Sequence, residues 1–156
     1  MNLPYLEQDC DLTLRDGLEL HYGVNPAFKE NTNLVPAFYN HDIAHVLFGL
    51  DTSIENEGLT DFRCMFSTTW GVKKYISDYF KDPNAMKVLL SIFKEAGYIK
   101  SIFNGFRSFP LWFKVYVDSK KMHKKWEINP DDSKLDMKLS DLRSDYNITV
   151  INYKHL

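Results

Sequence analysis

Four side chains of the kinds that bind metal ions lie within one short stretch of the sequence. They are His41, Asp42, His45 and Glu57. At 3.6 residues per turn, His41 and His45 are about 40° apart around a helix axis, and Asp42 falls within an arc of roughly 100° with them. One helix face can therefore offer three ligands to one ion, and the next helix can supply Glu57. The spacing predicts a metal site formed by these four residues.

The ligand types narrow the identity of the ion. Imidazole and carboxylate together suit Zn(II), Fe(II) or Mn(II), of which we favour Zn(II), whereas Ca²⁺ prefers oxygen alone. Structural zinc usually binds cysteine, so a site without thiolate favours catalysis. The only cysteines, Cys10 and Cys64, form no CxxC pair and are expected to be reduced thiols. The alternative is a polar cluster at a helix surface, because HD pairs and HxxxH spacings also occur without a metal.

The elements that must position these residues are predicted to be helices. Apolar residues recur at helical spacing from Val72 to Phe80 and from Met86 to Phe93. Further helices are expected over 9–22, 34–50, from 52 or 53 onward, 99–106, 110–119 and 135–146, with loops over 23–33 and 129–133. Thr52 and Glu55 have capping-box spacing, which leaves Glu57 free as a ligand. The segments 112–117 and 147–153 could be strands, but neither has an obvious partner, so the fold is predicted to be all-α.

Composition sets the broad class of the protein. At 156 residues, one domain spanning 1–156 is the default, and 15% aromatic residues suggest a core or cavity built from flat, bulky groups. A net charge of −2 does not indicate a basic surface that would bind nucleic acid. No apolar run reaches the roughly 18 residues that span a bilayer, and no targeting signal opens the chain. We therefore expect a cytoplasmic protein or one at the inner face of a membrane.

Two further groups of residues have weaker functional signals. His21 and His123 are isolated in the sequence and are predicted to have no functional role. Four lysines form a basic patch expected on one helix, and they are Lys120, Lys121, Lys124 and Lys125. A solvated face is the simpler interpretation of this patch, and contact with an anionic headgroup or phosphate is the other.

The metal motif has a family resemblance. HDxxH-x11-E, as His41, Asp42, His45 and Glu57, resembles the signature of the Coq-four family of ubiquinone (coenzyme Q) biosynthesis proteins. The stretch 45–49 resembles the HxLFG element of that family, and 125–127 with 139–148 resemble its closing W-E and LR-x4-I elements. The similarity covers roughly residues 34 to 148. Ala44 and Asn56 depart from the family pattern, and the segment before the motif is short.

The resemblance implies a helical bundle of about six to seven helices with an apolar groove for a polyprenyl tail. It implies a divalent ion, usually taken as zinc, held by the four motif residues. It also implies action on the ring carboxyl of a polyprenylated quinone precursor by oxidative decarboxylation, with peripheral membrane contact and other biosynthetic enzymes as partners. No catalytic residue is identified, and whether the chain forms a homodimer is left undecided.

Two other functions compete with this one. The first is a non-catalytic scaffold that binds an isoprenoid or another lipid and carries a structural metal, so whether the protein is an enzyme (a metal-dependent lyase) is left open. The second is a phosphohydrolase resembling the HD family, which would need an upstream histidine and a downstream aspartate. His21 with Asp78 or Asp82 could supply them, but no spacing recommends these residues.

Overall fold

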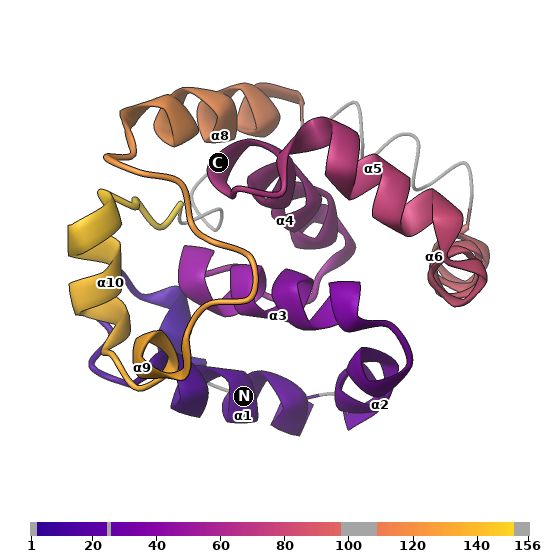
Figure 1. Cartoon of the computed structure of the whole chain (residues 1–156), viewed down its shortest axis with the longest axis horizontal. Helices are drawn as coiled ribbons and strands as arrows, with labels where there is room; N and C mark the ends of the chain where they lie inside the picture. The colour runs from indigo at the N-terminus through magenta and orange to yellow at the C-terminus, as the bar shows by residue number, and fades with distance from the viewer. Residues whose placement is uncertain (1–2, 25, 98–108, 152–156) are drawn as a thin grey trace.

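A computed structural model describes residues 3–24, 26–97 and 109–151, and within these ranges the protein is all-α (Figure 1). The helices there are η1 (Pro4–Leu6), α1 (Leu14–Val24), α2 (Pro26–Leu34), α3 (Pro36–Phe48), α4 (Ile54–Ser67), α5 (Gly71–Lys81), α6 (Pro83–Ala96), α8 (Phe109–Lys121), α9 (Asp132–Leu135) and α10 (Leu139–Tyr146). The all-α prediction is confirmed. The described residues alone hold nine α-helices, which is more than the six to seven expected.

The helix that carries the HD pair runs through the middle of the molecule. α3 contacts η1, α1, α2, α4 and α10, so it is surrounded by helices on several sides (Figure 1). Its apolar side chains Ile43, Val46 and Leu47 are fully buried. Pro36 occupies the first turn, and Gly49 closes the helix with a φ of 68° that favours glycine. The metal motif is therefore held on a rigid central element.

The start of α4 differs in detail from the predicted capping box. The N-cap is Ser53, and its side chain makes no capping hydrogen bond. Asp51, two residues before the N-cap, holds the start of the helix, because its carboxylate accepts hydrogen bonds from the Ser53 backbone N–H at 2.9 Å and from the Asn56 side-chain amide at 2.6 Å. Glu57 lies in the first turn of the helix, where the helix dipole favours a carboxylate.

Two other predictions are wrong in the described residues. The predicted loop over 23–33 mostly forms α2, because Phe28 stacks on the buried His21 ring, with centroids 5.2 Å apart, and this packing outweighs the local Gly and Asn content. The single helix over 135–146 is interrupted between α9 and α10. There the Leu139 N–H donates to the Leu12 carbonyl, so a contact with the chain before α1 replaces a helical hydrogen bond.

The remaining segment predictions have clear outcomes. The first candidate strand, 112–117, lies inside α8, and no strand occurs among the described residues, where 147–151 is irregular. The Asp82 cap of α6 is confirmed by hydrogen bonds to the Asn84 and Ala85 N–H groups. Lys120 and Lys121 end α8, whereas Lys124 and Lys125 follow it, so the basic patch does not lie on one helix. The predicted helix over 99–106 lies outside the described residues.

Arg143 joins the C-terminal end of α3 to the start of the chain. Its fully buried guanidinium donates to the Val46 and Leu47 carbonyls at the end of α3, each at 2.9 Å. It also donates to the carbonyls of Tyr5, Glu7 and Gln8. Burial lowers the pKa of Arg143 to about 10, so the side chain is protonated at neutral pH. This cation adds hydrogen bonds to carbonyls in the last turn of α3 and ties that helix end to the start of the chain.

Two predictions, about membrane-spanning segments and about the cysteines, have outcomes in the described residues. None of their helices is long and apolar enough to cross a bilayer. Cys10 and Cys64 are both buried and free, as expected for reduced thiols, and burial raises the pKa of the Cys64 thiol.

Candidate metal centre

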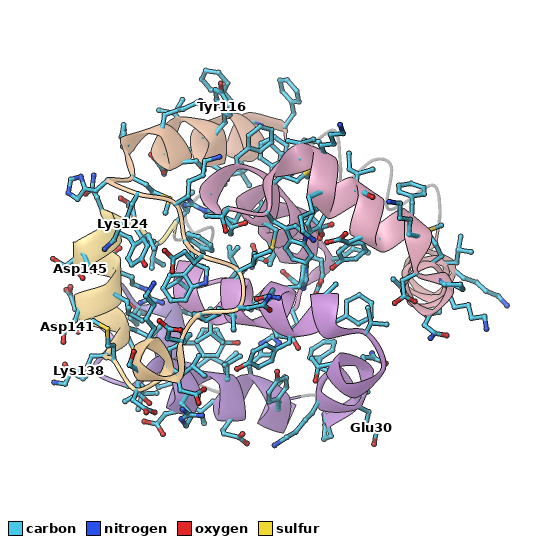
Figure 2. All side chains as sticks on the ribbon, viewed as in Figure 1. Glu30, Tyr116, Lys124, Lys138, Asp141 and Asp145 are labelled. Atoms are coloured by element: carbon cyan, nitrogen blue, oxygen red, sulfur yellow. The ribbon has the colours of Figure 1, made fainter. Side chains whose placement is uncertain are left out.

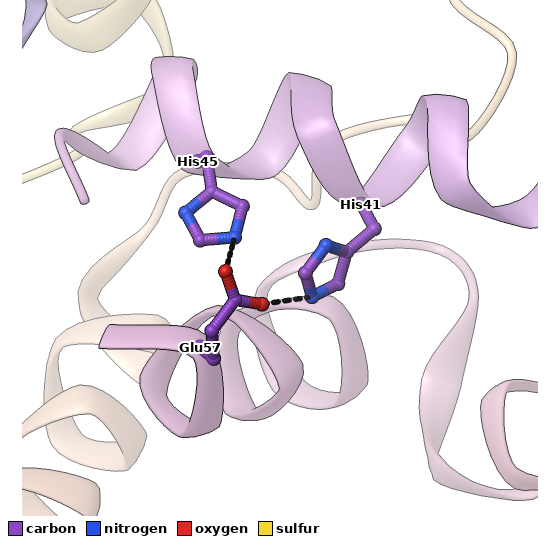
Figure 3. Close-up of side chains that lie close together, drawn as sticks. All are labelled: His41, His45 and Glu57. Carbon is purple, nitrogen blue, oxygen red and sulfur yellow. Dashed lines mark ion pairs between the residues drawn. The ribbon is translucent and has the colours of Figure 1, made fainter. Parts of the chain in front are cut away.

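Three of the four predicted ligands come together between α3 and α4. His41 and His45, one turn apart on α3, point toward the first turn of α4, where Glu57 extends one carboxylate oxygen toward each ring (Figure 3). Glu57 Oε1 lies 3.4 Å from His45 Nε2, and Glu57 Oε2 lies 3.9 Å from His41 Nε2. One ligand atom from each residue lies within 4.8 Å of the other two. These three residues could hold a metal ion.

The hydrogen-bond partners of His45 lie on one side of its ring, at Nδ1, and leave Nε2 facing Glu57. Its Nδ1 lies 3.3 Å from the Leu50 carbonyl oxygen, which can only accept, so Nδ1 carries the hydrogen. The Thr60 hydroxyl, 3.2 Å from the same nitrogen, donates its own proton to the Asn56 carbonyl. In the neutral ring, Nε2 then keeps its lone pair and faces the Glu57 carboxylate. This Nε2 is buried and has no hydrogen-bond partner among the described residues.

His41 is surrounded by carboxylates. Its Nε2 lies 3.0 Å from Asp61 Oδ1, in addition to the Glu57 contact. Burial acts to lower the pKa of His41, but Asp42, Asp61 and Glu57 together outweigh it and raise that pKa to about 10. Burial likewise acts to raise the pKa of Glu57, and the two imidazoles hold it below its usual value. The metal-free site is therefore an ion-pair cluster from which an ion must displace a proton.

Asp42, the fourth predicted ligand, faces α1 and stands outside the three-residue group. Its Oδ1 lies 3.6 Å from His21 Nε2 and 4.0 Å from His41 Nδ1. Burial acts to raise the pKa of Asp42, but the interactions with His21 and His41 lower it. A carboxylate behind a ligating imidazole is a common outer partner in metal sites. Direct ligation by Asp42 stays a prediction.

His21, which is isolated in the sequence, lies beside this cluster in the structure, and its predicted lack of a functional role stays a prediction. It is fully buried, its Nδ1 lies 3.3 Å from the Tyr5 hydroxyl, and its ring centroid is 5.2 Å from that of His45. Burial lowers the pKa of His21, which favours the neutral ring. Gly17, one turn earlier on α1, gives the only sequence hint. A Cβ there would lie 2.5 Å from Val46 Cγ1, so glycine permits the close approach of α1 to α3.

Asp61 is the second residue of the cluster that the sequence did not single out. It follows Glu57 by one turn on α4, and its Oδ1 accepts a short hydrogen bond from the Tyr75 hydroxyl as well as contacting His41. Its side chain is 40% exposed, against 10% or less for the two ligand-type histidines. Asp61 therefore marks the side on which solvent reaches the centre. The i, i+4 spacing from Glu57 is the signal that could have identified it.

The residues considered for a phosphohydrolase site are not collected together. His21 lies beside the HD pair, but Asp78 accepts hydrogen bonds from the Trp70 indole at 2.8 Å and from Lys74. Asp82 caps α6. Both aspartates therefore have structural partners of their own. His123 is exposed and follows α8, and His155 lies outside the described residues.

Comparisons of this chain with protein-family models, with curated proteins and with solved structures found no match. The similarity to the Coq-four family therefore depends on the motif residues alone. The geometry itself shows that the described residues are all-α and that the buried His41 and His45 lie close to the partly buried Glu57.

Proposed function

We propose that this chain is a divalent-metal protein whose ion is bound by His41, His45 and Glu57. The observation that carries the proposal is the grouping of two imidazoles and one carboxylate, because one ligand atom from each residue lies within 4.8 Å of the other two. The His45 Nε2, 3.4 Å from a Glu57 oxygen, is buried and has no hydrogen-bond partner among the described residues, so a bound cation would give it one. Nitrogen and oxygen donors without sulfur suit Zn(II), Fe(II) or Mn(II).

The reaction we favour is loss of the ring carboxyl group from a polyprenylated aromatic precursor of ubiquinone or a related quinone. Three protein ligands would leave a coordination position open to a substrate oxygen. The metal would polarise the ring carboxylate and stabilise charge that develops as the carboxyl group leaves as CO₂. In the oxidative reaction, a hydroxyl group from water would take its place on the ring carbon, and O₂ would accept the two electrons and two protons to give H₂O₂. Aromatic rings adjoin the exposed side of the centre, since Tyr75 binds Asp61 and packs against Trp70 and Tyr79 at 5.0 and 4.7 Å between centroids. Such surroundings suit an aromatic, greasy substrate.

A second candidate function is a non-catalytic lipid-binding scaffold with a structural metal. The observation that favours it is the position of the ligands, because His41 and His45 on α3 and Glu57 on α4 would let one ion cross-link two central helices. In that case, loss of a ligand costs stability as much as function. In the enzyme, ligand variants that remain folded lose turnover.

The first experiment measures the metal content of the purified full-length chain by inductively coupled plasma mass spectrometry. We expect about one divalent ion per chain in the wild type and in His123→Ala, a matched variant at an exposed histidine. His45→Ala and Glu57→Gln should carry none. Wild-type protein that takes up no divalent metal at neutral pH, even after incubation with Zn(II), would refute the metal centre.

The second experiment separates the enzyme from the scaffold. Metal-loaded protein is incubated with a prenylated 4-hydroxybenzoate derivative under air, and release of CO₂ from a labelled ring carboxyl is followed. Release that depends on His45 supports the lyase. Binding of the prenylated compound without CO₂ release would instead support the scaffold.

A further inference from the structure

The outer helix α8 has an exposed face of aromatic residues. Phe109, Phe113 and Tyr116 lie at i, i+4 and i+7, so they form one stripe along the helix. The two phenylalanines are 66% and 65% exposed, and Tyr116 is 38% exposed. The ring of Tyr116 projects outward from α8 in Figure 2. Single exposed apolar side chains are common, but three in line on a helix of 13 residues indicate a surface that contacts something.

Lysines extend and flank this aromatic stripe. Lys120 continues it by one turn, and its ammonium lies 5.3 Å from the centre of the Tyr116 ring. Lys114 and Lys121 are exposed beside it. The sole acidic residue of α8 is Asp118, which pairs with Lys121 at 3.6 Å. The helix is therefore positively charged in a chain whose net charge is −2.

The opposite face of α8 fixes the helix against α4, so the aromatic stripe cannot turn inward. Val115 and Ser119 are buried, and the Ser119 hydroxyl is hydrogen-bonded to that of Ser67 on α4 at 2.5 Å. The Trp112 ring stacks on Phe62 of α4, with centroids 5.6 Å apart and planes 14° apart. The stripe is thus presented to the outside by a rigid support.

We propose that the face of α8 formed by Phe109, Phe113, Tyr116 and Lys120 binds the surface of an anionic lipid bilayer. Phenylalanine rings enter the boundary between headgroups and acyl chains, tyrosine suits the interface, and lysine ammoniums contact lipid phosphates and carboxylates. The positive charge selects an anionic bilayer over a second copy of this chain, because two such helices in contact would bring like charges together. This inference goes beyond the proposed metal function and does not depend on it.

The test is co-sedimentation of the full-length chain with vesicles. We expect the wild type to bind vesicles of phosphatidylcholine mixed with phosphatidylserine, to bind phosphatidylcholine alone more weakly, and to be released by salt. The double variant Phe109→Ser/Phe113→Ser should lose at least about tenfold in binding, because two rings no longer leave water. Leu20→Ser, at an exposed residue of α1 across the molecule from α8, is the matched control and should bind normally (Figure 1).

A fluorescence measurement keeps the test independent of the double variant's folding. Phe113→Trp should show a blue-shifted emission on the mixed vesicles and quenching by brominated lipid, whereas Leu20→Trp should show neither. The proposal is overturned if the wild type ignores the mixed vesicles or if Phe109→Ser/Phe113→Ser binds them as well as the wild type does. It is equally overturned if analytical ultracentrifugation shows a wild-type dimer that this double variant abolishes while neither protein binds vesicles.

Discussion

Two groups of charged side chains in the described part of this protein are built in opposite ways. At Arg143, every donated hydrogen meets a backbone carbonyl, from Tyr5 near the start of the chain to Leu47 at the end of α3. At the His45 and Glu57 contact, the buried Nε2 of His45 lies 3.4 Å from a carboxylate oxygen and has no hydrogen-bond partner among the described residues. The Arg143 cluster is complete within the protein, whereas the histidine cluster leaves a ring nitrogen and a carboxylate that an ion could join. Burial of charge alone therefore does not indicate a functional site. A buried polar atom without a hydrogen-bond partner does.

The largest effect expected is the loss of the Arg143 cluster. Arg143→Met leaves several buried carbonyls without their donor, and we expect the free energy of unfolding to fall by about 3 to 5 kcal/mol. Urea denaturation followed by circular dichroism measures it. Arg15→Met, which removes an exposed ion pair with Asp136, is the control and should change stability little. An equal loss of stability in both variants would show that the buried Arg143 hydrogen bonds stabilise the protein no more than the exposed ion pair does.

Addition of metal should stabilise only the histidine cluster. With Zn(II) at a hundredfold excess over its dissociation constant, the wild type should gain about 2.7 kcal/mol in the free energy of unfolding. His45→Ala should gain nothing, because the free Nε2 is gone. Thermal melts with Zn(II) and with chelator measure the difference. A gain in His45→Ala equal to that of the wild type would place the ion elsewhere.

His21 should matter to metal affinity through Asp42. His21→Phe keeps a ring against Phe28 but removes the Nε2 atom that lies beside the Asp42 carboxylate. We expect a 10- to 100-fold loss of metal affinity, about 1.4 to 2.7 kcal/mol. His21→Gln, which can still donate to Asp42, should recover much of it. Phe28→Leu disturbs the same packing without a polar change and serves as the control. Competition with a chromophoric chelator measures all three, and a loss in Phe28→Leu as large as in His21→Phe would assign His21 to packing alone.

Metal binding should release a proton from His41. The pKa of this imidazole is raised to about 10 in the metal-free protein, so below that pH an ion competes with a proton, and affinity should rise with pH. One displaced proton gives about tenfold per pH unit, or about 1.4 kcal/mol. Calorimetry in buffers of different ionisation enthalpy counts the protons. At pH 9, just below the folded pKa of His41, Asp61→Asn should reduce the release by lowering that pKa. Release unchanged by this variant at pH 9 would show that Asp61 does not hold that proton in place.

The same raised pKa has a consequence for stability without metal. The pKa of His41 in the folded protein exceeds its ordinary value of about 6.5. Its contribution to the free energy of unfolding is therefore fully present below pH 6.5 and is lost as the pH rises toward 10. The lowered pKa values of Asp42 and Glu57 act in the other direction. Their contribution is present above about pH 4 and is lost as the pH falls through their folded values.

The sequence by itself determined the helical class and the three ligand-type residues that meet. His41 and His45 are one turn apart in any helix, and the short link to α4 limits where Glu57 can lie, so local geometry was enough. It also placed the Asp82 cap, because a capping side chain and its N–H partners are neighbours in the chain.

Only the tertiary structure decided which residues surround that group. His21 reaches Asp42 because Gly17 lets α1 approach α3, and no periodicity within α1 contains that information. Arg143 spans segments about 100 residues or more away from it in sequence. The helix α2 forms in a segment rich in loop-type residues because the Phe28 ring stacks on the ring of His21. In each case the deciding energy comes from packing between distant segments, which local patterns do not encode.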